Sequence, residues 1–192
     1  MTTLQVRGVN QPRLDVPANF RLIVTERHHR NGELVTVQRY QPAAPAIPYC
    51  EHVSLVWGSD GRLLSFNRFV RPTGIGLPSP SEAQVIAEAT MLGLDALYAH
   101  GLHFMRVLPQ ARGVIIDGHQ IEIPMRWVKF GHDNGSYNLV GVGAGGRVVE
   151  CEREAFWDYA RGRRATEEWN FDQWVLAREG RGVQPPAPES LA

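Results

Sequence analysis

Two short stretches of the chain place histidine beside acidic side chains, the residue types most often used for proton transfer. They are Asp117-Gly118-His119 and His132-Asp133-Asn134-Gly135. Acid–base catalysis needs such groups close together in a cleft. Each stretch, however, falls in a predicted hairpin turn, where Asp and Asn are favoured for backbone geometry alone. We favour the turn interpretation and keep as an alternative a small-molecule-binding or enzymatic cleft between sheet and helix, lined by His103, His119, His132 and Asp133.

Two other groups could bind a metal ion or attack a substrate. His100 and His103 are three residues apart, which on one helix would place them on one face, but Gly101 is expected to end the helix between them. Cys50 and His52 share a face if their segment is a strand, yet no orienting third group or oxyanion hole is identified. We predict no metal site, no cofactor and no catalytic residue, and an enzyme is the less favoured class.

The strongest candidate for function is an aromatic and basic segment near the C-terminus. Trp, Tyr and Arg are favoured at the centres of protein interfaces, and aromatic residues with Arg also bind single-stranded nucleic acid. A third interpretation is that the tryptophans anchor this arm on the sheet while the arginines pair with Glu150, Glu154, Glu167 and Glu168. The candidate residues are Trp157, Tyr159, Arg161, Arg163, Arg164, Trp169 and Trp174.

The composition limits the class of protein. The chain has 192 residues, of which 43% are hydrophobic, and its 20 basic and 20 acidic residues balance. This balance excludes a general electrostatic attraction to nucleic acid or to an anionic membrane. Two cysteines indicate no disulfide framework, and neither a signal peptide nor a membrane-spanning stretch is recognised. We therefore expect a cytoplasmic protein with no membrane partner.

One phrase occurs twice and indicates the scaffold. An apolar strand ends in an aromatic residue and a Gly- and Asp-rich turn follows, over Val56–Leu64 and again over Lys129–Tyr137. Asn31-Gly32 predicts a further hairpin turn. Between the two copies, Ser79-Pro80-Ser81-Glu82 has the pattern of a helix start with a capping box. The helix is expected from about Pro80 to Ala99 and apolar over a wide arc.

These signals predict an α+β fold, with an antiparallel sheet of several hairpins packed on one long helix and followed by a C-terminal helical arm. Residues 1–18 are expected to be a flexible N-terminal arm and residues 19–153 the core domain. Residues 154–179 are expected to form the helical arm, with one short helix over 154–162 and a second from Thr166. Residues 180–192, with three prolines, are expected to be disordered.

The helix and the second copy of the phrase together resemble a PepSY-like module over about residues 53–149. The matching pieces are Ser79–Ala83, which opens the helix, and the strands of Trp127–Val149. The resemblance implies a helix followed by a meander of strands, and a non-enzymatic role that is often inhibitory or regulatory. The chain departs from the pattern at Val142-Gly143-Ala144, where the family has an aspartate before the last Gly turn.

The expected function is a non-enzymatic binding or regulatory module. It would act through protein–protein contacts of the C-terminal arm or of an open sheet face, with self-association as a homodimer as one form of this. Two alternatives stay open. One is small-molecule binding or catalysis in the histidine-lined cleft, and the other, less favoured, is nucleic-acid binding through the patch Arg161–Arg164.

Overall fold

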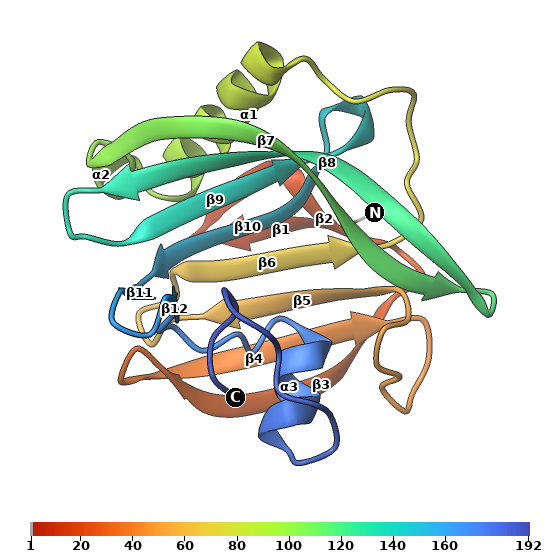
Figure 1. Ribbon diagram of the computed structural model, residues 1–192. Coiled ribbons are helices and arrows are strands. Elements are labelled where there is room, and N and C mark those ends of the chain that lie inside the picture. Colours follow the sequence, from red (N-terminus) through yellow and green to blue (C-terminus); the bar gives the residue numbers. More distant parts are fainter. Residues whose placement is uncertain (1) are drawn as a thin grey trace.

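The computed structural model describes residues 2–192, and its largest element is an eight-stranded sheet in which all named neighbours are antiparallel (Figure 1). The order is β3-β4-β5-β6-β10-β9-β8-β7. With its few helices, the protein is of the α+β class. The strands are β3 Arg21–Arg30, β4 Glu33–Gln41, β5 His52–Trp57, β6 Leu63–Phe69, β7 Leu102–Ile116, β8 His119–His132, β9 Tyr137–Val142 and β10 Val148–Ala155.

Tight turns join consecutive strands where the sequence predicts them. Asn31 and Gly32 between β3 and β4 have φ angles of 52° and 79°, and Asp117 and Gly118 between β7 and β8 have 52° and 77°. Positive φ at both central residues defines the type I′ turn, which matches the twist of the flanking strands. The hairpins expected at Asn31-Gly32 and over His52–Val70 are thus confirmed.

The strands β7 and β8 form one long hairpin, where the sequence suggests several shorter strands. Pro109 and Pro124 lie inside it and pair with Arg126 and Ala111. Proline is tolerated where its missing N–H is not needed by the neighbouring strand. Near the tip, the Ile115 N–H donates to the Tyr49 carbonyl at 2.7 Å, which draws this end of β7 toward the segment before β5.

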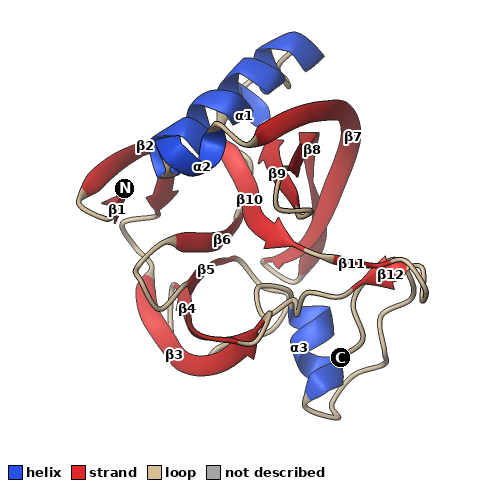
Figure 2. Ribbon diagram, turned by 90° about the vertical axis from the view of Figure 1, so that its left-hand side faces the viewer, coloured by secondary structure: helices blue, strands red, loops and turns tan. Residues whose placement is uncertain are grey.

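One side of the sheet is covered by the N-terminal residues and the longest helix (Figure 2). The strands β1 Thr2–Val6 and β2 Val9–Val16 form a hairpin, so the expectation of a flexible arm over residues 1–18 is wrong for the described residues 2–16. Leu14 is completely buried in the main hydrophobic cluster. The sequence signal was weak because Arg7-Gly8, rather than Asn-Gly, makes the turn.

The helix α1 spans Pro80–Leu94 and starts with the predicted capping box between Ser79 and Glu82. It ends earlier than expected, because Asp95 takes an extended conformation and caps a separate short helix, α2 Ala96–Ala99. The buried residues of α1 belong to the same hydrophobic cluster as the sheet residues Val128 and Val140. No helix in the described part of the chain has the length and apolar character needed to cross a bilayer.

The other side of the sheet is covered by the C-terminal residues (Figure 2). The helix expected over 154–162 is wrong, because these residues form the end of β10 and the strand β11 Trp157–Asp158, which pairs with β12 Arg163–Arg164. The only helix of this segment is α3 Asp172–Arg178. The helix expected from Thr166 starts later because the buried side chains of Thr166, Glu168 and Asn170 hydrogen-bond to residues distant in the sequence.

Residues 180–192 are held by specific contacts instead of being disordered. The Arg164 N–H donates to the Pro188 carbonyl at 2.8 Å, and the Arg163 side chain donates to the Pro185 carbonyl at 3.0 Å. The Ser190 N–H donates to Glu168 at 2.9 Å. Composition alone predicted disorder because this tail buries few apolar side chains, and its order comes from polar contacts that composition does not reveal.

Candidate functional site

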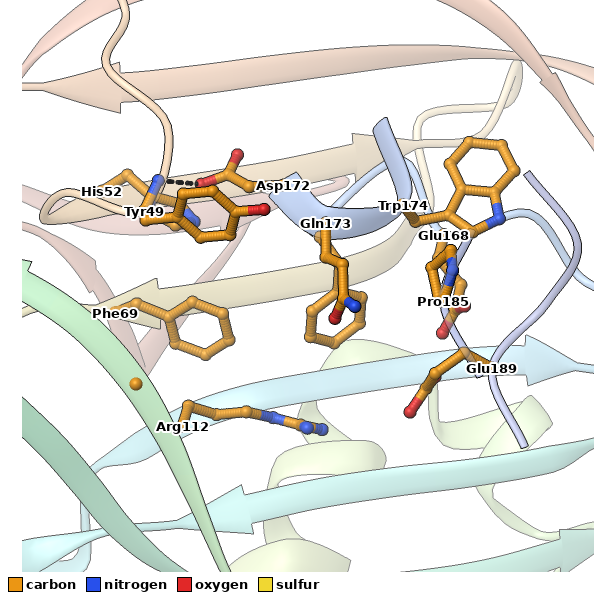
Figure 3. A pocket seen from close by; sticks show the side chains of 12 residues that line it. Tyr49, His52, Phe69, Arg112, Glu168, Asp172, Gln173, Trp174, Pro185 and Glu189 are labelled. Carbon is orange, nitrogen blue, oxygen red and sulfur yellow. Dashed lines mark hydrogen bonds between the residues drawn. The ribbon is translucent and has the colours of Figure 1, made fainter. Parts of the chain in front are cut away.

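Two neighbouring cavities are among those that lie between the sheet and the C-terminal segment. The lysine cavity, of about 190 Å³, has Trp127, Lys129 and Tyr137 from the sheet and Phe156 and Trp157 from the chain above it. The histidine cavity, of about 170 Å³, is lined by Tyr49, His52, Phe69 and Trp174 (Figure 3). Both cavities share one wall, formed by Arg112, Glu168, Phe171 and Glu189.

Lys129 gives the lysine cavity a cation without an ionic partner. Its Nζ lies 3.8 Å from the centre of the Tyr137 ring. Among residues 2–192 no carboxylate forms an ion pair with it, and Arg106 sits directly opposite on β7. Burial lowers the pKa of Lys129, and the charge of Arg106 lowers it further. Like charges directly opposite on neighbouring strands are destabilising, so this pair is suited to an anion.

Trp127, which also lines this cavity, carries a second unpaired donor. It lies two residues before Lys129 on β8, so both side chains point to the same face of the sheet. The indole Nε1–H of Trp127 is buried and has no acceptor within the described residues. A buried donor without a partner costs about 1–3 kcal/mol. A ligand with an acceptor oxygen would remove this cost.

The acidic residues that reach the lysine cavity are held by arginines. Glu152, at the floor, accepts hydrogen bonds from Arg164 and from Arg30, the latter at 3.1 Å. Burial acts to raise the pKa of Glu152, but the charges of Arg164 and Arg30 hold it below the usual value. Arg164 Nη1 also lies 3.3 Å from Glu168 Oε1. The negative charge of Glu152 is therefore compensated by arginines, while the positive charge of Lys129 has no carboxylate partner among the described residues.

The histidine cavity contains a buried imidazole with one unused nitrogen. His52 is 3% exposed, and its Nδ1 lies 2.8 Å from the Cys50 carbonyl oxygen. Because a carbonyl only accepts, Nδ1 carries the proton and Nε2 is left as an acceptor. Burial lowers the pKa of His52 to about 4, the charge of Arg39 lowers it too, and Asp172 opposes both. The ring is thus neutral at pH 7, and its Nε2 has no donor in the described structure.

Asp172, the first residue of α3, fixes the segment that closes the histidine cavity. Its carboxylate accepts from both Nη atoms of Arg39, at 2.5 and 3.0 Å, and from the Tyr49 N–H at 2.6 Å (Figure 3). Two residues earlier, Asn170 exchanges hydrogen bonds with Asn67. These contacts join the C-terminal segment to strands β4 and β6. They hold in place the part of this segment that covers the histidine cavity.

The aromatic and basic residues predicted as a binding arm divide into two groups. Trp174 and Arg164 are inside: Trp174 is 1% exposed, and Arg164 is tied to Glu152. Trp157 and Trp169 are half-buried, and Trp169 donates to the His29 carbonyl at 2.8 Å. Arg163, also half-buried, reaches the tail as described above. The exposed members are Tyr159, which is 73% exposed, and Arg161.

Three of the four residues of the alternative histidine-lined cleft lie together, but on an exposed surface and far from the fourth, His119. His103 and Asp133 form an exposed contact of 2.6 Å at the open end of the β7–β8 hairpin, near His132, which accepts from the Asn134 N–H. His119 lies at the closed end, where it pairs with Ile116. About 13 residues of strand separate the two ends, which is roughly 40 Å. The described residues also bring no three His, Cys, Asp or Glu side chains together as metal ligands.

Of the predicted residues, Trp157, Arg164 and Trp174 line the cavities, but sequence reasoning missed the groups that carry their unpaired polar atoms on the sheet. Lys129 and Tyr137 lie inside the second copy of the repeated phrase, which was interpreted as scaffold. A signal was present in the alternation of Trp127 and Lys129, the latter the only lysine of the chain, on one face of a strand. His52 was considered together with Cys50, and its free nitrogen depends on a contact with the Cys50 backbone that the sequence does not specify.

Glu168, which borders both cavities, is expected to make the stability of the fold dependent on pH. Burial raises the pKa of Glu168 to about 8; Arg164 opposes this, and the hydrogen bond and charge of Glu189 add to it. The folded state therefore binds this proton more tightly than the unfolded chain. We expect stability linked to Glu168 to be present below pH 5 and lost as pH rises toward 8, at up to about 1.4 kcal/mol per pH unit. Urea unfolding of the protein and of Glu168→Gln at pH 5, 6.5 and 8 measures the difference, and parallel profiles would contradict the assignment.

Comparison of the chain with protein-family models, with curated proteins and with solved structures found no match. The resemblance to PepSY-like modules consequently stays a prediction, and function has to be argued from the cavities.

Proposed function

We propose that the protein is a small-molecule-binding protein whose lysine cavity takes a small aromatic carboxylate. The observation that carries the proposal is the pair of unused donors on one strand face, the Lys129 ammonium and the Trp127 indole N–H. A carboxylate has two acceptor oxygens and one negative charge, which is the complement of these two groups. The aromatic character of the ligand is argued from the walls.

The walls of the lysine cavity favour a flat apolar body. Five aromatic side chains line it, those of Trp127, Tyr137, Phe156, Trp157 and Phe171. Aromatic pairs in offset or edge-to-face arrangement contribute about 0.5–1.5 kcal/mol beyond the area they bury. The volume of about 190 Å³ compares with an apolar cavity of about 150 Å³ that accommodates benzene. One or two fused rings with a carboxylate fit this combination of size and charge.

Binding through a protein partner, the function first expected from the sequence, has less support. Trp174 and Arg164 are used in packing and ion pairing within the chain, and both sides of the sheet are covered (Figure 2). Tyr159 and Arg161 stay exposed and are the remaining candidates for a partner contact. They do not border either cavity. A cleft ligand is therefore the better proposal.

Titration with 2-naphthoate tests the proposed function. We expect isothermal titration calorimetry to detect binding and the Lys129→Met variant to bind about 10-fold to 100-fold more weakly, because a hydrogen bond to a charged group contributes about 1.5–3 kcal/mol. The uncharged analogue 2-naphthamide should lose a similar factor in the unchanged protein. Removing the Lys129 charge next to Arg106 should not impair folding.

Arg27→Met is the matched control. Arg27 is an exposed cation on β3, and this strand lines neither cavity. It should leave the affinity for 2-naphthoate unchanged. The proposal is wrong if 2-naphthoate and 2-naphthamide bind equally, or if Lys129→Met retains the affinity of the unchanged protein.

A further inference from the structure

The histidine cavity is a second, partly open space with different chemistry. Its walls include the rings of Tyr49, Phe69, Phe171 and Trp174, and its volume is about 170 Å³. Figure 3 shows His52, Tyr49 and Asp172 at one end of the cavity and Glu189 at the other. A space of this size with apolar walls is sufficient for one six-membered aromatic ring.

The buried polar atoms around this cavity that lack a hydrogen-bond partner in the described structure include His52 Nε2 and the Trp174 indole Nε1–H. Arg112 is held by Glu150 through two hydrogen bonds, at 2.8 and 3.0 Å, and Arg39 is held by Asp172. The remaining unused group at this end is His52 Nε2, a neutral acceptor. It lies close enough to Asp172 for their charges to interact, so a ligand anion would be repelled there. A neutral ligand that donates one hydrogen bond fits.

We infer that the histidine cavity binds a small neutral phenol, with its ring against Phe69 and Phe171 and its hydroxyl donating to His52 Nε2. His52 meets Phe69 edge to face with the ring centres 5.3 Å apart, and Phe171 lies 6.1 Å from Phe69. The three rings thus form one aromatic corner in which the acceptor nitrogen stands beside the apolar surface. A phenol is the simplest molecule with a ring and a donor in this relation.

This inference does not rest on the proposed function, because it concerns a different cavity and a different charge type. The lysine cavity selects a negative charge through Lys129, while the histidine cavity selects a neutral donor through His52. Binding of a carboxylate in the lysine cavity and binding of a phenol in the histidine cavity can therefore be confirmed or contradicted separately. Lys129→Met should accordingly leave phenol binding unchanged within about 2-fold, a margin that allows for the wall that the cavities share.

Comparison of phenol with toluene on the unchanged protein tests the inference, because the two molecules have nearly the same shape and differ in the hydroxyl. Without an acceptor, an apolar cavity favours toluene, since burying an unpaired hydroxyl is unfavourable. We expect phenol to bind at least 10-fold more tightly than toluene in NMR titrations, with the ¹⁵N resonance of His52 Nε2 shifting as phenol is added. The same spectrum should report Nδ1 as the protonated nitrogen.

The variant His52→Phe should abolish the preference for phenol, and its folding is checked by circular dichroism. Should that variant fail to fold, the two ligands on the unchanged protein decide alone. The inference is overturned if toluene binds as tightly as phenol, if phenol leaves the His52 nitrogen resonance in place, or if phenol does not bind below 10 mM, a ceiling of roughly −2.7 kcal/mol.

Discussion

Replacing Arg164 with methionine is expected to lower the free energy of unfolding by about 3–5 kcal/mol. Arg164 donates to Glu152 through both of its Nη atoms, and Glu152 is 2% exposed. Removing the arginine leaves the Glu152 carboxylate with Arg30 as its one remaining cation. An uncompensated buried charge is among the largest single destabilising effects. A loss of this size is a large fraction of the roughly 5–15 kcal/mol by which an ordinary domain is stable.

Urea unfolding followed by tryptophan fluorescence measures this loss, and Arg161→Met is the matched control. Arg161 belongs to the same predicted patch but pairs with Asp158 at the surface, where its side chain is 70% exposed. Exposed pairs contribute about 0–1 kcal/mol. If the two variants have similar unfolding free energies, the buried network around Glu152 does not stabilise the fold as described.

Replacing Trp174 with alanine is expected to lower the free energy of unfolding by about 3–5 kcal/mol as well, here through lost packing. Trp174 is the largest fully buried side chain, and its ring meets the Trp169 ring edge to face with centres 4.7 Å apart. It is the buried residue of α3, so its removal also weakens the hold of that helix on the sheet. Hydrogen exchange of the α3 amides should therefore become faster in this variant.

Tyr159→Ala is the control for this prediction, since Tyr159 belongs to the same aromatic series and is 73% exposed. We expect a change of about 0.5 kcal/mol or less, although its hydroxyl contacts that of Tyr137 at 2.7 Å. An unfolding free energy of Trp174→Ala within 1 kcal/mol of the unchanged protein would show that α3 is not packed through Trp174.

The parts of the fold that the sequence predicted well are those set by local chemistry. Asn31-Gly32 and Asp117-Gly118 require turns because they accept positive φ, and Ser79 with Glu82 caps a helix through contacts three residues apart. Strand pairing follows from these turns. Turn and helix-cap signals depend only on residues close together in the sequence, so they can be recognised from the sequence alone.

The site could not be predicted in the same way, because its properties depend on long-range pairs. Arg164 was equally compatible with a surface patch and with an ion pair, and only its contact with Glu152, 12 residues away, decides. Asp172 reaches Arg39 across 133 residues. The free nitrogen of His52 and the unpaired ammonium of Lys129 are defined by partners that are absent in the described structure, which no local pattern reveals.

The shared wall of the two cavities has a further consequence. Phe171, Arg112, Glu168 and Glu189 border both spaces, so a ligand that displaces any of them toward one cavity reduces the room in the other. Occupancy of the two sites is then thermodynamically linked, and the linkage is reciprocal: whatever factor the first ligand imposes on the second, the second imposes on the first. If both proposed ligands bind, Phe171, which borders both cavities, is a residue through which one occupied site can affect the other.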